Sequence, residues 1–348
     1  MKAKHLLNLV GDRLYTLPLL VLYLTDGCNS RCVTCDIWRS PRRNMSPQLV
    51  DDLVSQCKSL NVRWVLLSGG EAMQHPEWPT IARRLRAEGA YVMLLTNGLL
   101  LRKQADQVAA SVDEVIVSLD GGTPETYHAI RGVDGFNLIL DGIRAVRALG
   151  LPVSTRTTVQ RANFRELPQI VEAAHSAGVN RVSFLTVDVS SATAFGPRFS
   201  ADPTLALTPA GHDPRITALT ADDVRAFARV LDEMETRFSA EFASGLISES
   251  PDKLRLMLDY FSALHGTGRF PAPRCNAPHI SVVVEVDGTL RPCYFLPEVG
   301  KLNGLSLQEV LNSPAAQALR QAYRTGQRPE CERCVCPLYK GPRALLRM

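Results

Sequence analysis

The sequence CNSRCVTC at residues 28–35 places three thiols within eight residues. It follows the apolar run from Leu19 to Leu24, at the point where a buried strand would give way to a loop. Three thiolates do not complete the four ligands of a structural zinc ion, whereas they suit a cubane iron–sulfur cluster that leaves one iron open to an outside ligand. The loop therefore predicts a cluster on Cys28, Cys32 and Cys35, with a zinc site as the alternative.

The composition is that of a globular protein with a sizeable core. Of the 348 residues, 45% are apolar and 21% are charged, and a formal net charge of +4 is small for a dedicated nucleic-acid binder. Residues 1–18 show no secretory signal, and no apolar run is long enough to span a membrane. The nine cysteines are therefore expected to be metal ligands in the reducing cytoplasm rather than disulfide partners.

Short β-rich runs alternate with helix-period runs from about Leu19 to Asp188. The strands are predicted at 19–24, 63–67, 91–95, 114–119, 153–159 and 181–187. Helices are predicted from Ser46, as an N-cap, to Leu60, and at about 77–88, 101–111, 136–149 and 164–177. Successive β–α units imply an α/β fold with a parallel sheet, which is either flat and doubly wound or curled into a partial barrel.

In both folds the chemistry gathers at the carboxyl ends of the strands. After the second strand come Gly69, Gly70 and Glu71, where glycines permit close backbone approach and the carboxylate can accept hydrogen bonds from an ammonium group. Further polar candidates stand at the ends of the third, fourth and fifth strands: Asn97, Ser118, Asp120 and Arg156. Ordinary turns and a surface arginine are the structural alternatives.

The spacing CxxxCxxC resembles the signature of the radical S-adenosylmethionine (SAM) superfamily. In that family the open iron is chelated by SAM, and one electron from the cluster splits the sulfonium. The 5′-deoxyadenosyl radical so released takes a hydrogen atom from the substrate. The resemblance implies a curled, partial (βα)6 TIM-like barrel.

The same resemblance implies roles for the strand-end residues. Gly69, Gly70 and Glu71 would bind the amino group of SAM, and Ser118 and Asp120 would lie near its ribose and carboxylate. Asn97 and Arg156 are further candidates for SAM binding, the latter at the carboxylate. One position departs from the family: Thr34 stands where an aromatic residue usually packs beside the adenine. Trp38 is either a substitute for it or simply a core tryptophan.

A second group of thiols lies near the C-terminus at Cys275, Cys293, Cys331, Cys334 and Cys336. A strand at 281–286, a turn at Asp287 and Gly288, and a return at 289–291 predict a β-hairpin that leads to Cys293. The two-residue spacing from Cys331 to Cys334 lets both thiolates reach one centre, which is either zinc or an iron–sulfur cluster.

Beside the first cluster, this region resembles the auxiliary-cluster domains of SPASM and twitch radical SAM enzymes. Five cysteines are fewer than a full SPASM domain with two auxiliary clusters requires, so the resemblance favours the twitch form with one auxiliary [4Fe–4S] cluster. Its implied ligands are Cys275, Cys293, Cys331 and Cys334, with Cys336 as a substitute ligand. The leftover Cys57 falls on the apolar face of a predicted helix and is expected to be buried.

The predicted organisation has four parts. An N-terminal extension spans 1–18, the barrel 19–189, and a twitch/SPASM-like domain with a hairpin and a helix 271–348. Between them, 190–270 begins with a long loop to Ala218 and continues with helices at 221–242 and 251–264. This middle segment is a linker, a lid or part of a substrate pocket, and the sequence does not separate these.

These resemblances predict a radical SAM oxidoreductase. An auxiliary cluster that accepts an electron would make the reaction a dehydrogenation, as in the twitch-type dehydrogenase of aminocyclitol antibiotic assembly that the cluster arrangement resembles. A thiol such as Cys336 that returns hydrogen would give an epimerase, and attack on another atom would form thioether or carbon–carbon bonds in a peptide.

Only 18 residues precede the first strand, where peptide maturases often carry a leader-recognition domain. We therefore expect a small, hydroxylated, sugar- or aminocyclitol-like substrate. The expected partner is a one-electron donor such as flavodoxin or ferredoxin, and neither membrane nor nucleic acid is expected. A non-enzymatic protein with two zinc sites would explain the cysteines but not the position of Glu71.

Overall fold

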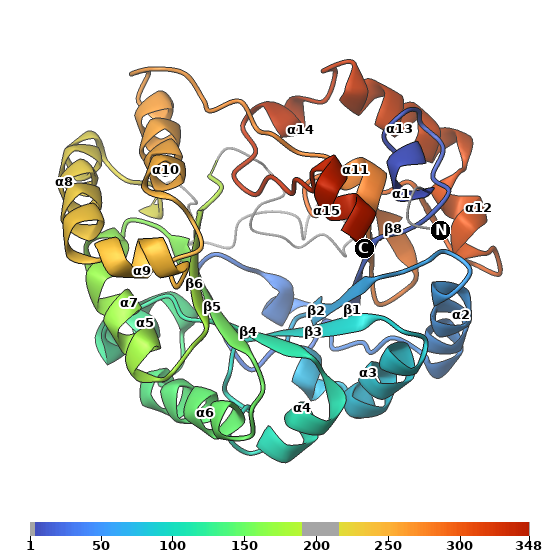
Figure 1. Ribbon diagram of the computed structural model, residues 1–348, viewed down its shortest axis with the longest axis horizontal. Coiled ribbons are helices and arrows are strands. Elements are labelled where there is room, and N and C mark those ends of the chain that lie inside the picture. The colour runs from blue at the N-terminus through green and yellow to red at the C-terminus, as the bar shows by residue number, and fades with distance from the viewer. Residues whose placement is uncertain (1–3, 190–215, 348) are drawn as a thin grey trace.

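A curled, open sheet with helices around its outer side forms the frame of the molecule (Figure 1). The computed structural model describes residues 4–189 and 216–347. Six parallel strands run in chain order along the sheet: β1 (Leu19–Thr25), β2 (Trp64–Gly69), β3 (Tyr91–Thr96), β4 (Glu114–Ser118), β5 (Val153–Val159) and β6 (Arg181–Thr186). All six predicted strands are confirmed to within two residues. Strand β6 lies at one end of the sheet and does not pair with the strand at the opposite end. The barrel is therefore partial, as the family resemblance implied.

The C-terminal hairpin continues the same sheet. Strand β7 (Ser281–Val284) pairs in parallel with β1, from Leu19 opposite Ser281 to Leu22 opposite Val284. Strands β8 (Thr289–Arg291) and β9 (Gly300–Lys301) then follow in antiparallel order. The predicted hairpin is confirmed, and its pairing covers the β1 edge, which would otherwise expose unpaired backbone groups.

Helices cover the outer side of the strands. They are α2 (Pro47–Cys57), α3 (Trp78–Ala87), α4 (Ala105–Ser111), α5 (Pro124–Arg131), α6 (Phe136–Ala148), η3 (Phe164–Glu166) with α7 (Leu167–Ser176), α8 (Ala221–Arg237), α9 (Ser239–Ser244) and α10 (Pro251–Leu264). The predicted helix at 221–242 is divided at Phe238, and the one at 101–111 begins four residues later, at Ala105. Helix α5 was not predicted.

The remaining helices lie toward the two ends of the chain or in the loops after β1 and β2. They are α1 (Lys4–Leu7), η1 (Ile37–Arg39), η2 (Ala72–Gln74), α11 (Ala277–Ile280), α12 (Leu307–Leu311), α13 (Pro314–Arg324), α14 (Pro329–Glu332) and α15 (Pro342–Arg347). Figure 1 shows α1 beside α13 and α15, so the two ends of the chain lie together. Most of the predicted loop from Ser190 to Ala218 lies outside the described residues. No helix among the described residues is both long and apolar enough to cross a membrane.

Local sequence explains why α2 begins and packs where it does. The Ser46 hydroxyl accepts a hydrogen bond from the Leu49 N–H, and Pro47 occupies the first turn, where its missing N–H costs nothing. The apolar face, including Leu53 and Cys57, is buried against the sheet. Cys57 is 2% exposed, which confirms that it is a buried thiol.

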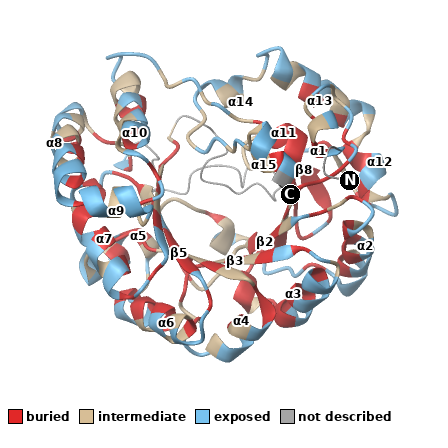
Figure 2. Ribbon diagram, viewed as in Figure 1, coloured by how far each residue is buried: buried red, intermediate tan, exposed pale blue. Residues whose placement is uncertain are grey.

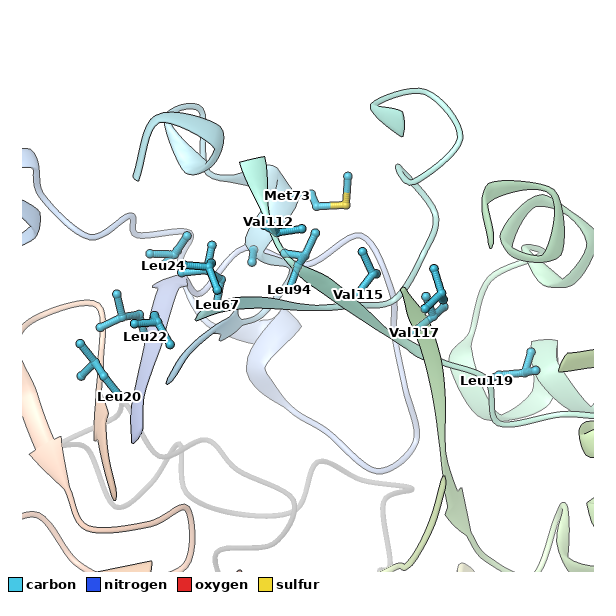
Figure 3. Close-up of a cluster of buried hydrophobic side chains, with 14 of the residues drawn as sticks. Leu20, Leu22, Leu24, Leu67, Met73, Leu94, Val112, Val115, Val117 and Leu119 are labelled. Atoms are coloured by element: carbon cyan, nitrogen blue, oxygen red, sulfur yellow. The ribbon is translucent and has the colours of Figure 1, made fainter. Parts of the chain in front are cut away.

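The core lies between the strands and the helices. Figure 2 shows buried residues in the strands and on the helix faces turned toward them, with exposed residues outside. Figure 3 shows Leu20, Leu22 and Leu24 of β1 with Leu67 and Leu94 of the next strands, all at most 1% exposed. Since side chains alternate along a strand, the residues between them face the open inner side, called the lumen here.

Candidate active site

The loop that carries the first three cysteines rests on Gly69 and Gly70 at the end of β2. The Gly70 N–H donates to the Thr25 carbonyl over 2.7 Å, and the Glu71 N–H donates to the Gly27 carbonyl over 2.8 Å. A Cβ atom on Gly70 would lie 2.3 Å from the Gly27 oxygen, so only glycine lets the loop pass this closely. The sequence predicted close approach of a ligand here; the structure shows close approach of the cysteine loop itself.

Glu71 ties the ends of two strands together. Its carboxylate is 1% exposed and accepts hydrogen bonds from the Asn97 N–H at 2.7 Å, the Thr96 hydroxyl at 2.9 Å and the Met73 N–H at 3.1 Å. Burial raises its pKa, and these hydrogen bonds oppose that shift. A carboxylate offers about four acceptor positions, so one position stays available to an ammonium group.

Asn97 holds the cysteine loop from the end of β3. Its side-chain amide donates to the Asn29 side chain at 2.7 Å and to the Ser30 hydroxyl at 3.1 Å, and lies 3.8 Å from the Cys28 sulfur. Gly98 takes the positive φ of 83° that the predicted turn requires. In this structure Asn97 therefore positions the thiols rather than reaching outward.

The three thiols of the loop are free and close to one another. Cys32 is buried, and Cys28 and Cys35 are half-buried. Burial raises the pKa of Cys28 to about 11 and that of Cys35 to about 12, and the other thiols of the loop add to both shifts. Cys28 and Cys35 would therefore give up a proton on binding a metal centre, since metals bind the thiolate form.

Asp120 lies beneath the cysteine loop rather than exposed to the lumen. One carboxylate oxygen forms a 2.5 Å ion pair with Arg131 at the end of α5, and the other accepts from the Thr158 N–H at 2.7 Å. Arg131 also donates to the Cys32 sulfur over 3.5 Å. The sequence reasoning missed Arg131. The sequence feature that could have located it is the helix start at Thr123 and Pro124, one turn after Asp120. A short helix that begins there ends at Arg131.

Ser118 and Arg156 are neighbours across β4 and β5, where they are paired in register. Ser118 is half-buried and Arg156 is exposed, and both alternate with buried residues on the outer side. Among residues 4–189 and 216–347, no carboxylate forms an ion pair with Arg156. It is therefore a cation facing the lumen and available to an anionic group.

Buried donors around the first thiols fit an added group. In the described residues Arg131 Nε, the Tyr127 hydroxyl and Trp38 Nε1 are buried and have no hydrogen-bond partner. Trp38 is half-buried, with the Arg39 guanidinium 4.5 Å from its ring, so it is not a core tryptophan. An anionic cluster with a bound nucleoside would supply hydrogen-bond acceptors to these unpaired buried donors.

The second group of thiols is also brought together. Cys275, Cys293, Cys331 and Cys334 are half-buried and Cys336 is exposed. Burial raises the pKa of Cys293 to about 11 and that of Cys331 to about 12, with neighbouring thiols adding to each shift. Around them, the Tyr323 hydroxyl donates to the Cys275 carbonyl over 2.5 Å. All five thiols thus lie near one another, with Cys334 half-buried and Cys336 exposed.

Neither group of thiols is contracted around a point. Within residues 4–189 and 216–347, no three cysteine, histidine or carboxylate side chains converge as a single bound ion requires. Thiolates on one zinc ion lie about 2.3 Å from the metal, whereas a cubane cluster holds each thiolate on a different iron.

A pocket of about 390 Å³ lies between the barrel and the second group of thiols. One wall is the lumen side of β5 and β6, with Arg156, Ser183 and Leu185. The facing walls come from α10, with Lys253 and Tyr260, and from the C-terminal segment that carries Cys334 and Cys336. The pocket thus joins a candidate SAM residue to the candidate auxiliary-cluster loop.

Comparison with known families accounts for both groups of thiols. Residues 22–174 match the radical SAM superfamily model, and residues 275–335 match the SPASM iron–sulfur cluster-binding domain. The first match contains Cys28, Cys32 and Cys35, and the second contains four of the five C-terminal cysteines.

Similar curated proteins differ in activity. The AdoMet-dependent heme synthase of Methanosarcina barkeri is 33% identical over 168 residues, which are 46% of this chain and 48% of that protein. The PqqA peptide cyclase of Streptomyces rochei is 30% identical over 169 residues, covering 47% and 46% of the two chains. A probable GTP 3′,8-cyclase of Thermococcus kodakarensis is 35% identical over 167 residues, covering 46% and 53%. The chain thus spans about half the length of these relatives.

Solved structures share the architecture over nearly the whole chain. SuiB of Streptococcus suis bound to S-adenosylmethionine is 14% identical with a TM-score of 0.64, and the match covers 97% of this chain and 76% of that one. The anSMEcpe enzyme with bound AdoMet and a peptide is 16% identical with a TM-score of 0.61, covering 92% and 86%. At such identities the likeness concerns the fold alone.

An open α/β barrel with three thiols at the end of β1 and a second thiol group beside its lumen defines an iron–sulfur enzyme. The chain carries a radical SAM domain over residues 22–174 and a C-terminal SPASM iron–sulfur cluster-binding domain over residues 275–335. Its cofactors are SAM and [4Fe–4S] clusters, as these two domains imply.

Proposed function

We propose that the protein is a radical SAM dehydrogenase of a small, hydroxylated substrate. In this proposal Cys28, Cys32 and Cys35 hold the SAM-cleaving cluster. Four other cysteines, Cys275, Cys293, Cys331 and Cys334, hold one auxiliary [4Fe–4S] cluster. SAM and the first cluster, when bound, supply the radical that abstracts hydrogen, and an external one-electron donor such as flavodoxin or ferredoxin supplies the electron.

The pocket between the barrel and the C-terminal segment carries this proposal. Its volume of about 390 Å³ lies in the range of small-molecule sites, about 300–1,000 Å³. Because Cys334 and Cys336 line the pocket, a substrate held there would be next to the auxiliary-cluster loop. A short path for an electron from substrate to auxiliary cluster supports dehydrogenation.

The reaction balances with two acceptors. The carbinol carbon loses a hydrogen atom to the 5′-deoxyadenosyl radical, and the remaining radical loses one proton to solvent and one electron to the auxiliary cluster. The product is a carbonyl compound two mass units lighter than the alcohol. For SAM itself we propose that Glu71 accepts from the amino group and that Ser118 and Arg156 bind the ribose and carboxylate side.

The cluster content tests the proposal first. After anaerobic reconstitution, wild type should hold about eight irons, and the Cys28→Ala, Cys32→Ala, Cys35→Ala variant about four. Only wild type should form 5′-deoxyadenosine from SAM and dithionite, and Cys57→Ala should match wild type. About four irons in wild type and none in the triple variant would remove the electron acceptor and contradict the dehydrogenase proposal.

The substrate class is tested with a panel of polyols, aminocyclitols and short peptides. A true substrate should raise 5′-deoxyadenosine formation, transfer deuterium into it from the labelled carbon, and yield a product two mass units lighter. The relatives include a peptide cyclase and a heme synthase. Turnover of a peptide but of no polyol would therefore contradict the small-substrate proposal.

An epimerase is the second candidate, and the exposure of Cys336 favours it. This thiol lines the pocket, is the most exposed of the C-terminal cysteines, and lies just beyond the residues that match the SPASM domain. A thiol at that place could return a hydrogen atom to the substrate. In heavy water an epimerase product would gain one deuterium with no loss of two mass units, and Cys336→Ala would abolish the product but not 5′-deoxyadenosine.

A further inference from the structure

The last turn of α5 is the platform on which the first cysteine loop rests. The N–H groups of Arg31 and Val33 donate to the carbonyls of Arg131 and Ile130, each over 2.9 Å. These carbonyls are among those that a helix end leaves without partners, so the loop completes the helix. Gly132 follows at a φ of 66°, and a Cβ atom there would lie 2.7 Å from the Arg31 oxygen.

The side chain of Arg131 turns from this platform toward the thiols. It is 13% exposed, and one terminal nitrogen lies 2.5 Å from the Asp120 carboxylate. The other terminal nitrogen donates to the buried Cys32 sulfur over 3.5 Å, and Nε is buried without a partner. The guanidinium therefore has one acid partner, one sulfur partner and one donor left over.

Charge determines what this arrangement does to a cluster. Three thiolates give a [4Fe–4S] centre a negative charge, and one-electron reduction adds another. A buried cation beside one thiolate stabilises the reduced form more than the oxidised form, so it raises the reduction potential. The Asp120 carboxylate opposes this effect, because it cancels part of the guanidinium charge.

We propose that Arg131 is a positioning residue that orients Cys32 and raises the reduction potential of the SAM-cleaving cluster, with Asp120 as the counter-ion that limits this effect. The inference rests on the proposed assignment of Cys28, Cys32 and Cys35 to that cluster. It gives Asp120 a role through Arg131 instead of the direct SAM contact that the family resemblance implied.

A redox titration of the reconstituted holoenzyme, followed by electron paramagnetic resonance, tests the proposal. The variants are Arg131→Gln, Asp120→Asn and, as a control, Arg144→Gln, whose arginine pairs with Asp141 on the surface of α6. The variant without the first three cysteines identifies the signal of the auxiliary cluster. Iron is counted in every sample.

At the potential where the wild-type cluster is half-reduced, Arg131→Gln should lower the ratio of reduced to oxidised cluster about tenfold, a shift of ~59 mV for one electron. Asp120→Asn should shift it in the opposite direction, and Arg144→Gln should leave it unchanged. If Arg131→Gln does not retain the cluster, the sign of the Asp120→Asn shift decides. A negative or absent shift in Asp120→Asn, or wild-type potential in an iron-replete Arg131→Gln, overturns the proposal. Failure of the cysteine assignment would give a different result, because wild type and the triple cysteine variant would then hold the same amount of iron.

Discussion

Single residues at the ends of β2 and β3 hold the cysteine loop before any cofactor is considered. Gly70 leaves room for the Gly27 carbonyl, Glu71 accepts from the Asn97 backbone, and the Asn97 side chain holds Asn29 and Ser30. Each of these contacts joins the end of a strand either to the neighbouring strand end or to the cysteine loop. The thiols are therefore positioned by main-chain and buried polar contacts that do not tolerate added volume.

Gly70→Ala should abolish iron uptake at the first site. Its Cβ would lie 2.3 Å from the Gly27 oxygen and 2.8 Å from the Asp26 oxygen, and backbone cannot move aside as a flexible side chain can. We expect iron to fall from about eight to about four per chain, with loss of 5′-deoxyadenosine formation.

Gly11→Ala is the matched control for this substitution. A Cβ atom on Gly11 would have no heavy atom within 4 Å, and this glycine has no left-handed backbone conformation to strain. It should keep wild-type iron content. Full iron content and SAM cleavage in Gly70→Ala would show that the loop adapts, contrary to this prediction.

The sequence located these residues but not their partners. Gly69, Gly70, Glu71, Asn97 and Asp120 were all found at strand ends, because apolar runs end at a polar residue. What Glu71 or Asp120 binds depends on groups 26 and 11 residues away, the Asn97 backbone N–H and the Arg131 guanidinium. Such pairings depend on how strand ends meet in space, and hydrophobic periodicity carries no information about that.

At the scale of elements, α5 shows where the expectation of one helix between successive strands fails. The link from β4 to β5 holds two helices, α5 and α6, although one crossover helix is sufficient for a parallel pair. Helix α5 has eight residues with a Thr123 cap, and it supplies the platform and Arg131. A short helix buries few apolar residues, so the helical repeat of apolar residues is weak in its sequence.

The start of α8 depends on a capping box. The Thr220 hydroxyl accepts from the Asp223 N–H, and the Asp223 carboxylate accepts in return from Thr220, while Arg161 and Arg165 pair with the same carboxylate. Through these arginines the cap also fastens α8 to the segment after β5. Helix α8 packs on α10, which lines the pocket.

Thr220→Ala should therefore destabilise the protein by about 1 kcal/mol, the usual cost of losing an N-cap side chain. Thr220→Ser keeps the hydroxyl and should lie near wild type. The denaturation midpoint followed by circular dichroism measures both. Equal midpoints for Thr220→Ala and wild type would mean that the box contributes nothing to α8.

On the scale of the whole molecule, the two ends of the chain are joined. The Asn8 amide donates to the His279 carbonyl at 3.0 Å, and Arg320, which is 1% exposed, donates to the carbonyls of Asp12 and Leu311, each at 2.5 Å. With β7 paired to β1, the C-terminal region is continuous with the barrel sheet at its first strand. The C-terminal region that carries the second group of thiols is thus held against the barrel by contacts from both ends of the chain.

This junction is the part of the fold that the sequence could not predict. The hairpin was found from its Asp287-Gly288 turn, and residues 1–18 were expected as an extension. The partner of β7 lies some 260 residues earlier, so any exposed edge was equally compatible with the sequence. Parallel pairing over such a separation leaves no local turn signal.

His279 should make this junction sensitive to acid. The imidazole is 4% exposed, and burial first, then the Arg320 charge, lowers its pKa from 6.5 to about 4. Arg324 acts in the same direction, and Asp12 opposes them. Between these values the unfolded chain binds a proton that the folded chain excludes, so stability is full above about pH 6.5 and falls as the pH drops toward 4.

The slope from this one group is at most about 1.4 kcal/mol per pH unit. Denaturation midpoints measured from pH 7.5 to 4.5 should therefore fall less steeply in His279→Gln than in wild type. His175→Gln, which removes an exposed imidazole from α7, should keep the wild-type slope. Identical pH profiles for wild type and His279→Gln would show that His279 is not held neutral in the folded protein, and that the junction between the chain ends does not respond to protons in this range.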